Sequence, residues 1–348
     1  MKNIFYMKKI SKIGGVESFL YYLSKLYKDF VVYYKEADGK QIERLAKNVE
    51  VHKYTKPIKC DRFFCSYSYN IEVEAKEYYH IIHYDAMNVG FIPMTNDGFK
   101  YIGVSKIACK SFLEKTGNKC ELIYNPVSIP NPRVKKLTDK IHLISATRLS
   151  KEKGGDRINK LAEMLDKAGV DYDWTIYTNK VNYDFKSKNI TTKEQQLDLT
   201  KEIKKSTYLV QLSSCESFGL SVCESLILGT PVIVTDLEAF KEIGCKHGEN
   251  AIICDLDMKK VDIDMIKKGL PKFKYKAPKS NWDKYLTTES DYDPKDLVKV
   301  RTKKRIWDTK EDIHYKAQRF YDMKMCRASY MEAMDYVEVL DVIKKEMM

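Results

Sequence analysis

The sequence of 348 residues has no hydrophobic run long enough to cross a membrane. A membrane-spanning helix needs ~18 or more apolar residues in a row, and no segment of the chain approaches that length. The first residues turn basic again after a few apolar positions, so the start is not that of a signal peptide. Because 44% of the residues are hydrophobic and 32% are charged, we expect a soluble globular protein of the cytoplasm.

Cysteines and carboxylates lack the spacing of a disulfide framework or of a metal site. The nine cysteines are an odd number and are scattered, and Cys60 and Cys65 are too far apart for a C-x-x-C motif. Reduced thiols are therefore expected. No cluster of carboxylates typical of a Mg²⁺ site is found either, so the sequence predicts no metal and no other cofactor.

Acidic residues are too few to balance the basic ones. The sequence has 61 Lys and Arg against 49 Asp and Glu, a formal net charge of +12. This excess indicates either an anionic partner or only a well-solvated surface. Nucleic acid is not expected as that partner, because no recognisable nucleic-acid-binding module is present and the 25 tyrosines are spread along the chain.

The order of predicted elements divides the chain into two α/β halves. Runs of β-forming residues alternate with helical patterns, and this alternation restarts after a linker that contains two prolines. We predict an N-terminal domain over residues 1–130 and a C-terminal domain over residues 141–266. Residues 267–296 are predicted to be a linker with room for a terminal helix. Residues 297–348 are predicted to form a small appended module, whose role the sequence does not indicate.

The most informative segment is 207–236, which predicts a strand, a loop, a helix and a second strand. Both strands are short apolar runs typical of buried parallel strands. The helix is expected to begin near Phe218 or Gly219, with Ser213 and Ser214 offering side-chain caps. The loop therefore follows the carboxyl end of a strand, which is where open α/β sheets bind ligands.

Two glutamates border this predicted crevice. Glu216 lies in the loop, and Glu224 lies about two turns along the helix. Gly219 has no side chain to cover its backbone, and free N–H groups at a helix N-terminus attract phosphate. The alternative interpretation is a charge at the helix start for Glu216 and a solvated helix position for Glu224.

A loop follows the predicted first strand of each half. Gly14 and Gly15 lie between a strand and a helix, where paired glycines allow the backbone to approach a ligand closely. The corresponding loop of the second half, 147–155, carries Arg148 and Lys153. A guanidinium fork and a point charge on one loop can hold two phosphates, although solvated basic residues are the alternative.

Together these motifs resemble the signature of retaining glycosyltransferase family four. The match rests on Glu-Ser-Phe-Gly-Leu at 216–220, on the seven residues between the two glutamates, and on Leu-Gly-Thr-Pro-Val-Ile-Val-Thr-Asp at 228–236. The loop 147–155 resembles the family's Gly-Arg-Leu-x-x-x-Lys-Gly loop, with Thr147 in place of the usual glycine. The resemblance is dense over 141–255 and loose before it.

The resemblance implies a GT-B fold, which is α/β with two Rossmann-like domains facing a cleft. It implies a retaining, metal-independent hexosyltransferase that moves a hexosyl-type unit from a nucleoside-diphosphate sugar to an acceptor hydroxyl. The acceptor would be a saccharide, a lipid-linked saccharide or a protein, in the synthesis of a cell-surface polysaccharide or glycoconjugate. Basic and apolar residues alternate over 267–279, so this strip is a candidate for docking on the anionic inner face of the membrane, with an exposed linker as the alternative.

The same resemblance assigns roles to individual residues. Glu224 would hold the ribose hydroxyls of the donor, and Arg148 and Lys153 would hold its diphosphate. Glu216, which would contact hydroxyls of the donor sugar, is one of two candidate catalytic residues. The remaining residues predicted to bind the donor are Ser217, Phe218, Gly219, Leu220, Gly14 and Gly15.

The second candidate catalytic residue is His83, which follows two apolar residues at the end of a predicted strand. The resemblance implies a histidine that faces the donor sugar near this position. A structural histidine is an equal alternative. His80 is the other candidate for the same role.

Two other classes of protein fit parts of this pattern. A sugar-nucleotide epimerase or a sugar phosphorylase shares the two-domain architecture. A non-catalytic protein that binds an anionic glycan or nucleic acid would use the same basic surface without turnover.

Overall fold

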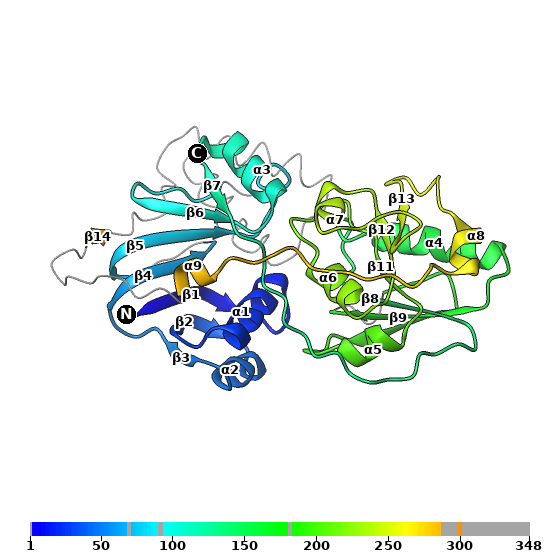
Figure 1. Cartoon of the computed structure of the whole chain (residues 1–348), viewed down its shortest axis with the longest axis horizontal. Helices are drawn as coiled ribbons and strands as arrows, with labels where there is room; N and C mark the ends of the chain where they lie inside the picture. Colours follow the sequence, from blue (N-terminus) through cyan, green and yellow to red (C-terminus); the bar gives the residue numbers. More distant parts are fainter. Residues whose placement is uncertain (1, 68–70, 90–92, 180–182, 287–297, 301–348) are drawn as a thin grey trace, which may run out of the picture.

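The structure, a computed structural model, describes residues 2–67, 71–89, 93–179, 183–286 and 298–300. Within these residues the chain forms two α/β units side by side, the first from the N-terminal part of the chain and the second from residue 141 onward (Figure 1). None of the described helices is both long and apolar enough to span a membrane.

The first unit is a sheet whose strands lie in the order β3-β2-β1-β4-β5-β6-β7. Its strands are β1 (Asn3–Ile10), β2 (Phe30–Ala37), β3 (Glu50–Lys53), β4 (Ile58–Ser66), β5 (Val73–Ile82), β6 (Phe99–Gly103) and β7 (Cys120–Leu122). Its helices are α1 (Gly15–Leu26), α2 (Gly39–Ala46) and α3 (Lys106–Thr116). The neighbouring strands of this order are parallel, and the order reverses beside β1, which lies between β2 and β4.

The second unit repeats this design with the strand order β10-β9-β8-β11-β12-β13. Its strands are β8 (Ile141–Ala146), β9 (Tyr172–Thr178), β10 (Ile190–Glu194), β11 (Tyr208–Gln211), β12 (Val232–Thr235) and β13 (Ala251–Cys254). Its helices are α4 (Gly155–Lys167), α5 (Thr200–Lys205), α6 (Leu220–Ile227), α7 (Glu238–Glu242) and α8 (Ile263–Lys268). All of these strand pairs are parallel, and the order is that of a Rossmann sheet, with its reversal between β8 and β11.

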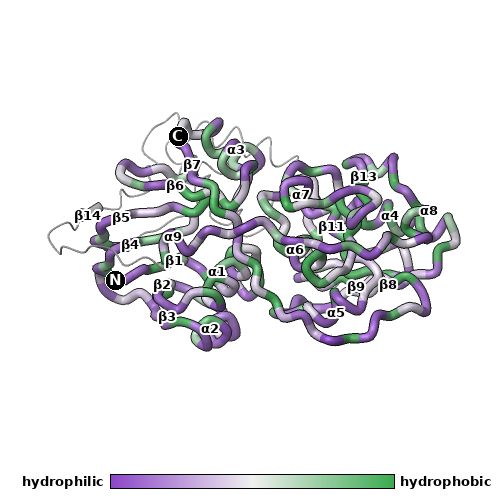
Figure 2. Tube along the Cα trace, in the orientation of Figure 1, coloured by the Kyte–Doolittle hydropathy of each residue, from purple (hydrophilic) through white to green (hydrophobic). Residues whose placement is uncertain are grey.

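Burial on both faces explains the composition of the central strands. Every residue of β11 and of β12 is buried, and so are the first five residues of β1. Figure 2 shows hydrophobic residues along the interior strands and hydrophilic residues on α2 and the outer loops. Such continuous apolar runs are what a parallel sheet covered by helices requires.

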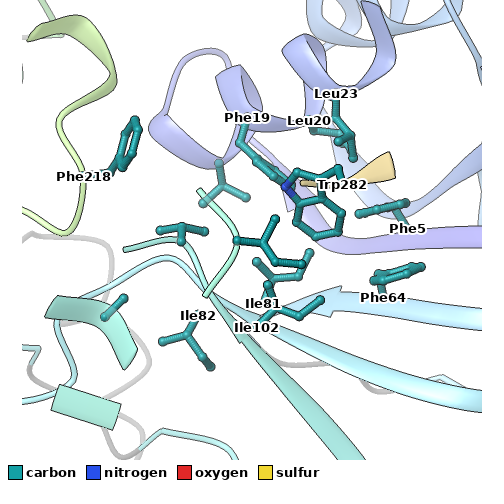
Figure 3. Close-up of a cluster of buried hydrophobic side chains, with 14 of the residues drawn as sticks. Phe5, Phe19, Leu20, Leu23, Phe64, Ile81, Ile82, Ile102, Phe218 and Trp282 are labelled. Atoms are coloured by element: carbon teal, nitrogen blue, oxygen red, sulfur yellow. The ribbon is translucent and has the colours of Figure 1, made fainter. Parts of the chain in front are cut away.

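The chain returns from the second unit to the first through a short helix, α9 (Asp283–Leu286). Trp282 is fully buried there, with its ring 5.9 Å from that of Phe5, 5.4 Å from that of Phe19 and 6.0 Å from that of Phe64 (Figure 3). A buried aromatic cluster of this kind fixes the end of the segment on the first sheet. This helix lies within residues 267–296, the segment for which the sequence allows a terminal helix.

The predicted appended module falls almost wholly outside the described residues. Of 297–348, the structure describes β14 (Val298–Val300), which pairs antiparallel with β5 of the first sheet. The division at 130, 141 and 266 remains a prediction, although the two sheets fall on either side of it.

Candidate functional site

Both strand-order reversals place loops at the carboxyl edges of the sheets. Gly14 and Gly15 follow β1, the loop from Thr147 to Gly154 follows β8, and the loop from Leu212 to Gly219 follows β11. Crevices at such reversals are the usual ligand sites of open α/β sheets. The candidate site is therefore assembled from three loops, two of them from the second unit.

Glu216 and Lys153 form a mostly buried ion pair between two of these loops. The Lys153 Nζ lies 2.8 Å from the Glu216 Oε1, and both side chains are 15% exposed. The Ser213 Oγ donates to the same carboxylate oxygen at 2.8 Å. Burial alone lowers the pKa of Lys153, but the Glu216 and Glu152 carboxylates raise it, and the net pKa is above its usual value. Lys153 is therefore a fixed cation beside a fixed anion.

Gln211 and Thr147 extend this network beneath the ion pair. The Gln211 side-chain amide donates to Ser213 at 2.7 Å, and it lies 3.4 Å from both the Thr147 Oγ1 and the Glu216 Oε1. Thr147 is buried. The residue that departs from the family pattern therefore ties the loop after β8 to the end of β11.

Gly154 and Arg157 fix the same loop from the other side. Gly154 has φ of 86°, and a Cβ there would overlap the Leu212 carbonyl. The Arg157 Nε donates to that carbonyl at 2.5 Å, and its guanidinium also reaches the Lys151 and Glu152 carbonyls. Sequence reasoning missed Arg157, because an arginine in the first turn of a helix has no distinguishing signal of its own.

Gly219 is required for a reason other than the one expected. It has φ of 85° as the N-cap of α6, and a Cβ there would overlap the Phe240 ring. No side chain caps the helix, so the caps expected from Ser213 and Ser214 were wrong. The Ser213 hydroxyl instead contacts Glu216. The first N–H groups of α6 still have no partner within the helix, which leaves them suited to an anion.

Arg148 lies close enough to Glu17 of the first unit to interact with it electrostatically. Its side chain is exposed. Its charge lowers the pKa of Glu17, although burial dominates and raises that pKa overall. Glu17 is buried on α1, and its carboxylate accepts from the Ser11 N–H at 2.7 Å. A Cβ on Gly14 would overlap this carboxylate, whereas one on Gly15 would meet open space.

His83 lies where the two units meet, while His80 is enclosed in the first unit. The Ser217 Oγ donates to the His83 carbonyl at 2.7 Å, and the His83 Nε2 shares a hydrogen bond with the Ser66 Oγ at 3.1 Å. Burial lowers the pKa of His83 to about 3, so its imidazole is neutral near pH 7. His80 is 1% exposed and bonds the Met94 carbonyl at 3.1 Å. The geometry favours His83 over His80 as a residue of the site.

The Glu224 carboxylate is hydrogen-bonded to the first unit and lies outside the hydrogen-bond network around Glu216. The Tyr22 hydroxyl on α1 donates to the Glu224 Oε1 at 2.6 Å. Burial raises the pKa of Glu224 to about 7, and the hydrogen bond from Tyr22 and the charge of Arg44 lower it only in part. Sequence reasoning missed Tyr22, because its position on an amphipathic helix is typical of a core residue.

Metal ligands are not grouped in the described part of the chain. Among those residues, no three His, Cys, Asp or Glu side chains are placed to hold a metal ion. The eight cysteines that the structure describes are free thiols.

Comparison with known proteins agrees with this geometry. Residues 130–273 match the family described as glycosyl transferases group 1. That segment contains the loop after β8, the loop after β11 and both glutamates. No curated protein is similar enough in sequence to count as a relative.

Several solved structures share the architecture at low sequence identity. HepE of Anabaena, in complex with UDP and glucose, is 15% identical with a TM-score of 0.60, over 77% of this chain and 89% of that one. A glycosyltransferase from Rickettsia africae is 11% identical with a TM-score of 0.54, over 77% and 88%. The lipopolysaccharide outer core galactosyltransferase WaaB is 14% identical with a TM-score of 0.51, over 77% and 94%. The chain thus has the GT-B fold with two Rossmann-like domains, and its residues 130–273 are similar to the glycosyl transferases group 1 family.

Proposed function

We propose that the protein is a retaining, metal-independent glycosyltransferase of family four that moves a hexosyl-type unit from a nucleoside-diphosphate sugar to an acceptor hydroxyl. The observation that carries the proposal is the Lys153–Glu216 pair, a fixed cation and a fixed anion at the strand-order reversal of the second domain. The family match over residues 130–273 and the UDP-bound HepE structure support the same donor class.

In this mechanism the positively charged groups of the site lie where negative charge develops as the donor bond breaks. The bond between the anomeric carbon and the diphosphate breaks, so negative charge accumulates on the diphosphate. The acceptor oxygen forms the new bond to the anomeric carbon, and its proton passes to the departing diphosphate. Lys153, Arg148 and the N–H groups of residues 218–220 stabilise this negative charge, which preorganised cations and backbone donors do without reorganisation. Glu216 accepts hydrogen bonds from hydroxyls of the sugar, and Glu224 does so from the ribose. The neutral imidazole of His83 faces the sugar, with its orientation fixed by Ser66.

Incubation with a panel of sugar nucleotides, with and without candidate acceptors, tests the proposal. The acceptors are saccharides, lipid-linked saccharides and peptides. Release of nucleoside diphosphate together with a glycosylated acceptor is the expected result. A changed sugar on an intact nucleotide indicates an epimerase, and release of a sugar phosphate with inorganic phosphate present indicates a phosphorylase. Binding without turnover indicates a glycan-binding protein.

Chelation of divalent cations should leave transfer unaffected. The leaving diphosphate is assigned to cationic side chains, so no metal is needed to neutralise it. We expect equal rates in EDTA and in added Mg²⁺ for the donor identified by the panel. A loss of activity in EDTA that Mg²⁺ or Mn²⁺ restores would show that metal ligands have been overlooked.

We further propose that the enzyme docks on anionic membranes, where lipid-linked acceptors for a cell-surface polysaccharide would be found. The segment after α8 alternates in exposure, so that Phe273 and Tyr275 pack inward. The Tyr275 hydroxyl donates to the Ile243 carbonyl at 2.7 Å. Four exposed lysines of the same segment form the lysine strip, which consists of Lys272, Lys274, Lys276 and Lys279. An anchored segment with lysines on its outer side presents its charges together.

Neutralising the whole lysine strip to glutamine should abolish sedimentation with vesicles that contain phosphatidylserine. Each basic residue near such a surface contributes about 1 kcal/mol, so four together suffice for binding that high salt reverses. Single substitutions should matter little. If the variant and the intact chain sediment alike at low salt, the strip is only a linker. If the intact chain does not bind, the acceptor is soluble or protein-borne.

A further inference from the structure

One hydrogen bond joins the two domains at the carboxylate assigned to the ribose. The Tyr22 Oη and the Glu224 Oε1 lie 2.6 Å apart, although the residues are 202 positions apart in the chain. Tyr22 is 6% exposed, so its ring is packed and its hydroxyl is held in place. This contact reaches from α1 of the first domain to α6 of the second, and Figure 1 shows these helices on facing sides of the junction.

The surroundings of the Glu224 carboxylate also come from both domains. The charges that act on it besides Tyr22 are Arg44 on α2 and Asp198, which precedes α5. The Arg44 guanidinium lies 3.5 Å from the centre of the Tyr21 ring, which holds it on the first domain. A partly buried carboxylate needs hydrogen-bond donors, and here the first domain supplies one.

The hydroxyls of a ribose can donate the same kind of hydrogen bond to Glu224 as the Tyr22 hydroxyl does. The vicinal hydroxyls of the ribose are O–H donors to a carboxylate, as is the Tyr22 hydroxyl. The Tyr22 hydroxyl occupies one hydrogen-bonding position on the Glu224 Oε1, so a ribose hydroxyl can take that position only when Tyr22 withdraws. The two donors therefore compete for that position.

We propose that Tyr22 is a latch, which occupies the ribose position on Glu224 when no donor is bound and is displaced when the nucleotide enters. This inference rests on the proposed function, since it takes Glu224 as the ribose ligand. The latch holds the two domains together when no donor is bound. Its displacement by the nucleotide couples donor binding to movement of the first domain, which also carries Gly14, Gly15 and His83.

The Tyr22–Glu224 hydrogen bond is one of several contacts that hold the two domains together. The backbone N–H of Lys106 donates to the Glu242 Oε1 at 2.6 Å, and the Ser217 hydroxyl donates to the His83 carbonyl at 2.7 Å. Ser280 also donates to the Tyr124 carbonyl at 2.8 Å. Loss of the Tyr22 hydroxyl therefore loosens one side of the junction and leaves the fold intact.

The test compares Tyr22→Phe with Tyr21→Phe in the full-length chain. Tyr21 is the neighbouring tyrosine, and its ring packs against Arg44. Small-angle scattering without nucleotide measures the radius of gyration, and calorimetry measures the affinity for UDP, GDP, ADP and dTDP. We expect Tyr22→Phe to enlarge the radius and to bind the preferred nucleotide about threefold to tenfold more tightly, because a larger fraction is competent to bind. Tyr21→Phe should match the wild type in both.

A third variant separates the latch from the proposed function. Glu224→Gln keeps an oxygen acceptor for Tyr22, so its radius should match the wild type, whereas its nucleotide affinity should fall. An unchanged radius in Tyr22→Phe, or a weaker affinity in that variant, overturns the latch. If the wild type binds none of the four nucleotides, the proposed function fails at its donor site, and the scattering comparison alone decides whether Tyr22 closes the junction.

Discussion

Replacement of Glu216 by glutamine is expected to abolish most sugar transfer while the protein stays folded. The substitution keeps the size of the side chain but removes the charge that pairs with Lys153 at 2.8 Å. Removal of one partner from a buried charge pair costs roughly 2–5 kcal/mol, which corresponds to a rate loss of about 30-fold or more. The loss should appear in kcat/KM, because Glu216 is assigned to the sugar that reacts.

Glu152→Gln is the matched control for that substitution. The Glu152 carboxylate also lies near Lys153, at 3.1 Å, but its side chain is 51% exposed. Exposed ion pairs contribute little, so the rate should change by less than about threefold. Both variants should still unfold cooperatively, Glu152→Gln at the wild-type temperature and Glu216→Gln at a lower one, because Lys153 then lacks its buried partner. Transfer by Glu216→Gln at the wild-type rate would remove Glu216 from the site.

Lys153→Ala should cause the largest loss of affinity for the nucleoside diphosphate. Lys153 stays protonated, since the adjacent carboxylates hold its pKa above the usual value despite burial. Its removal takes a cation from the diphosphate and leaves Glu216 buried without its partner, at a cost of roughly 2–5 kcal/mol in calorimetric affinity. Arg148→Ala should weaken binding by less, because its side chain is exposed in the free protein.

The control for these variants is Lys151→Ala, on the same loop. Its side chain is exposed, and it has no assigned role in binding the diphosphate. The affinity should not change. Equal affinities for the wild type, Lys153→Ala and Arg148→Ala would show that the diphosphate binds elsewhere.

The proximity of Lys153 and Glu216 was predictable from sequence because it depends on topology. Both residues follow strands of one parallel sheet, and their loops meet where β8 and β11 are neighbours. A resemblance that covers both loops then specifies the charges. The GT-B fold was predictable for the same reason, since two alternating α/β halves have few ways to pack.

Contacts that depend on how the domains meet were not predictable. No local pattern indicates that Tyr22 reaches Glu224, because their separation is fixed by the packing of whole domains. The reason for Gly219 was hidden too, since it depends on Phe240 in the next helix. Thr147 is a related case, because its bond to Gln211 at 3.4 Å gives a buried role to a residue that departs from the family motif.

Proton NMR of the reaction mixture decides whether the protein is a retaining glycosyltransferase. The preferred sugar nucleotide is mixed with its acceptor, and the anomeric signal of the donor is followed until it disappears. A retaining transferase should replace this signal, in equal amount and with the same anomeric configuration, by that of a glycoside, and should release free nucleoside diphosphate. A product of inverted configuration, a different sugar on the intact nucleotide, or an unchanged donor signal would contradict this assignment.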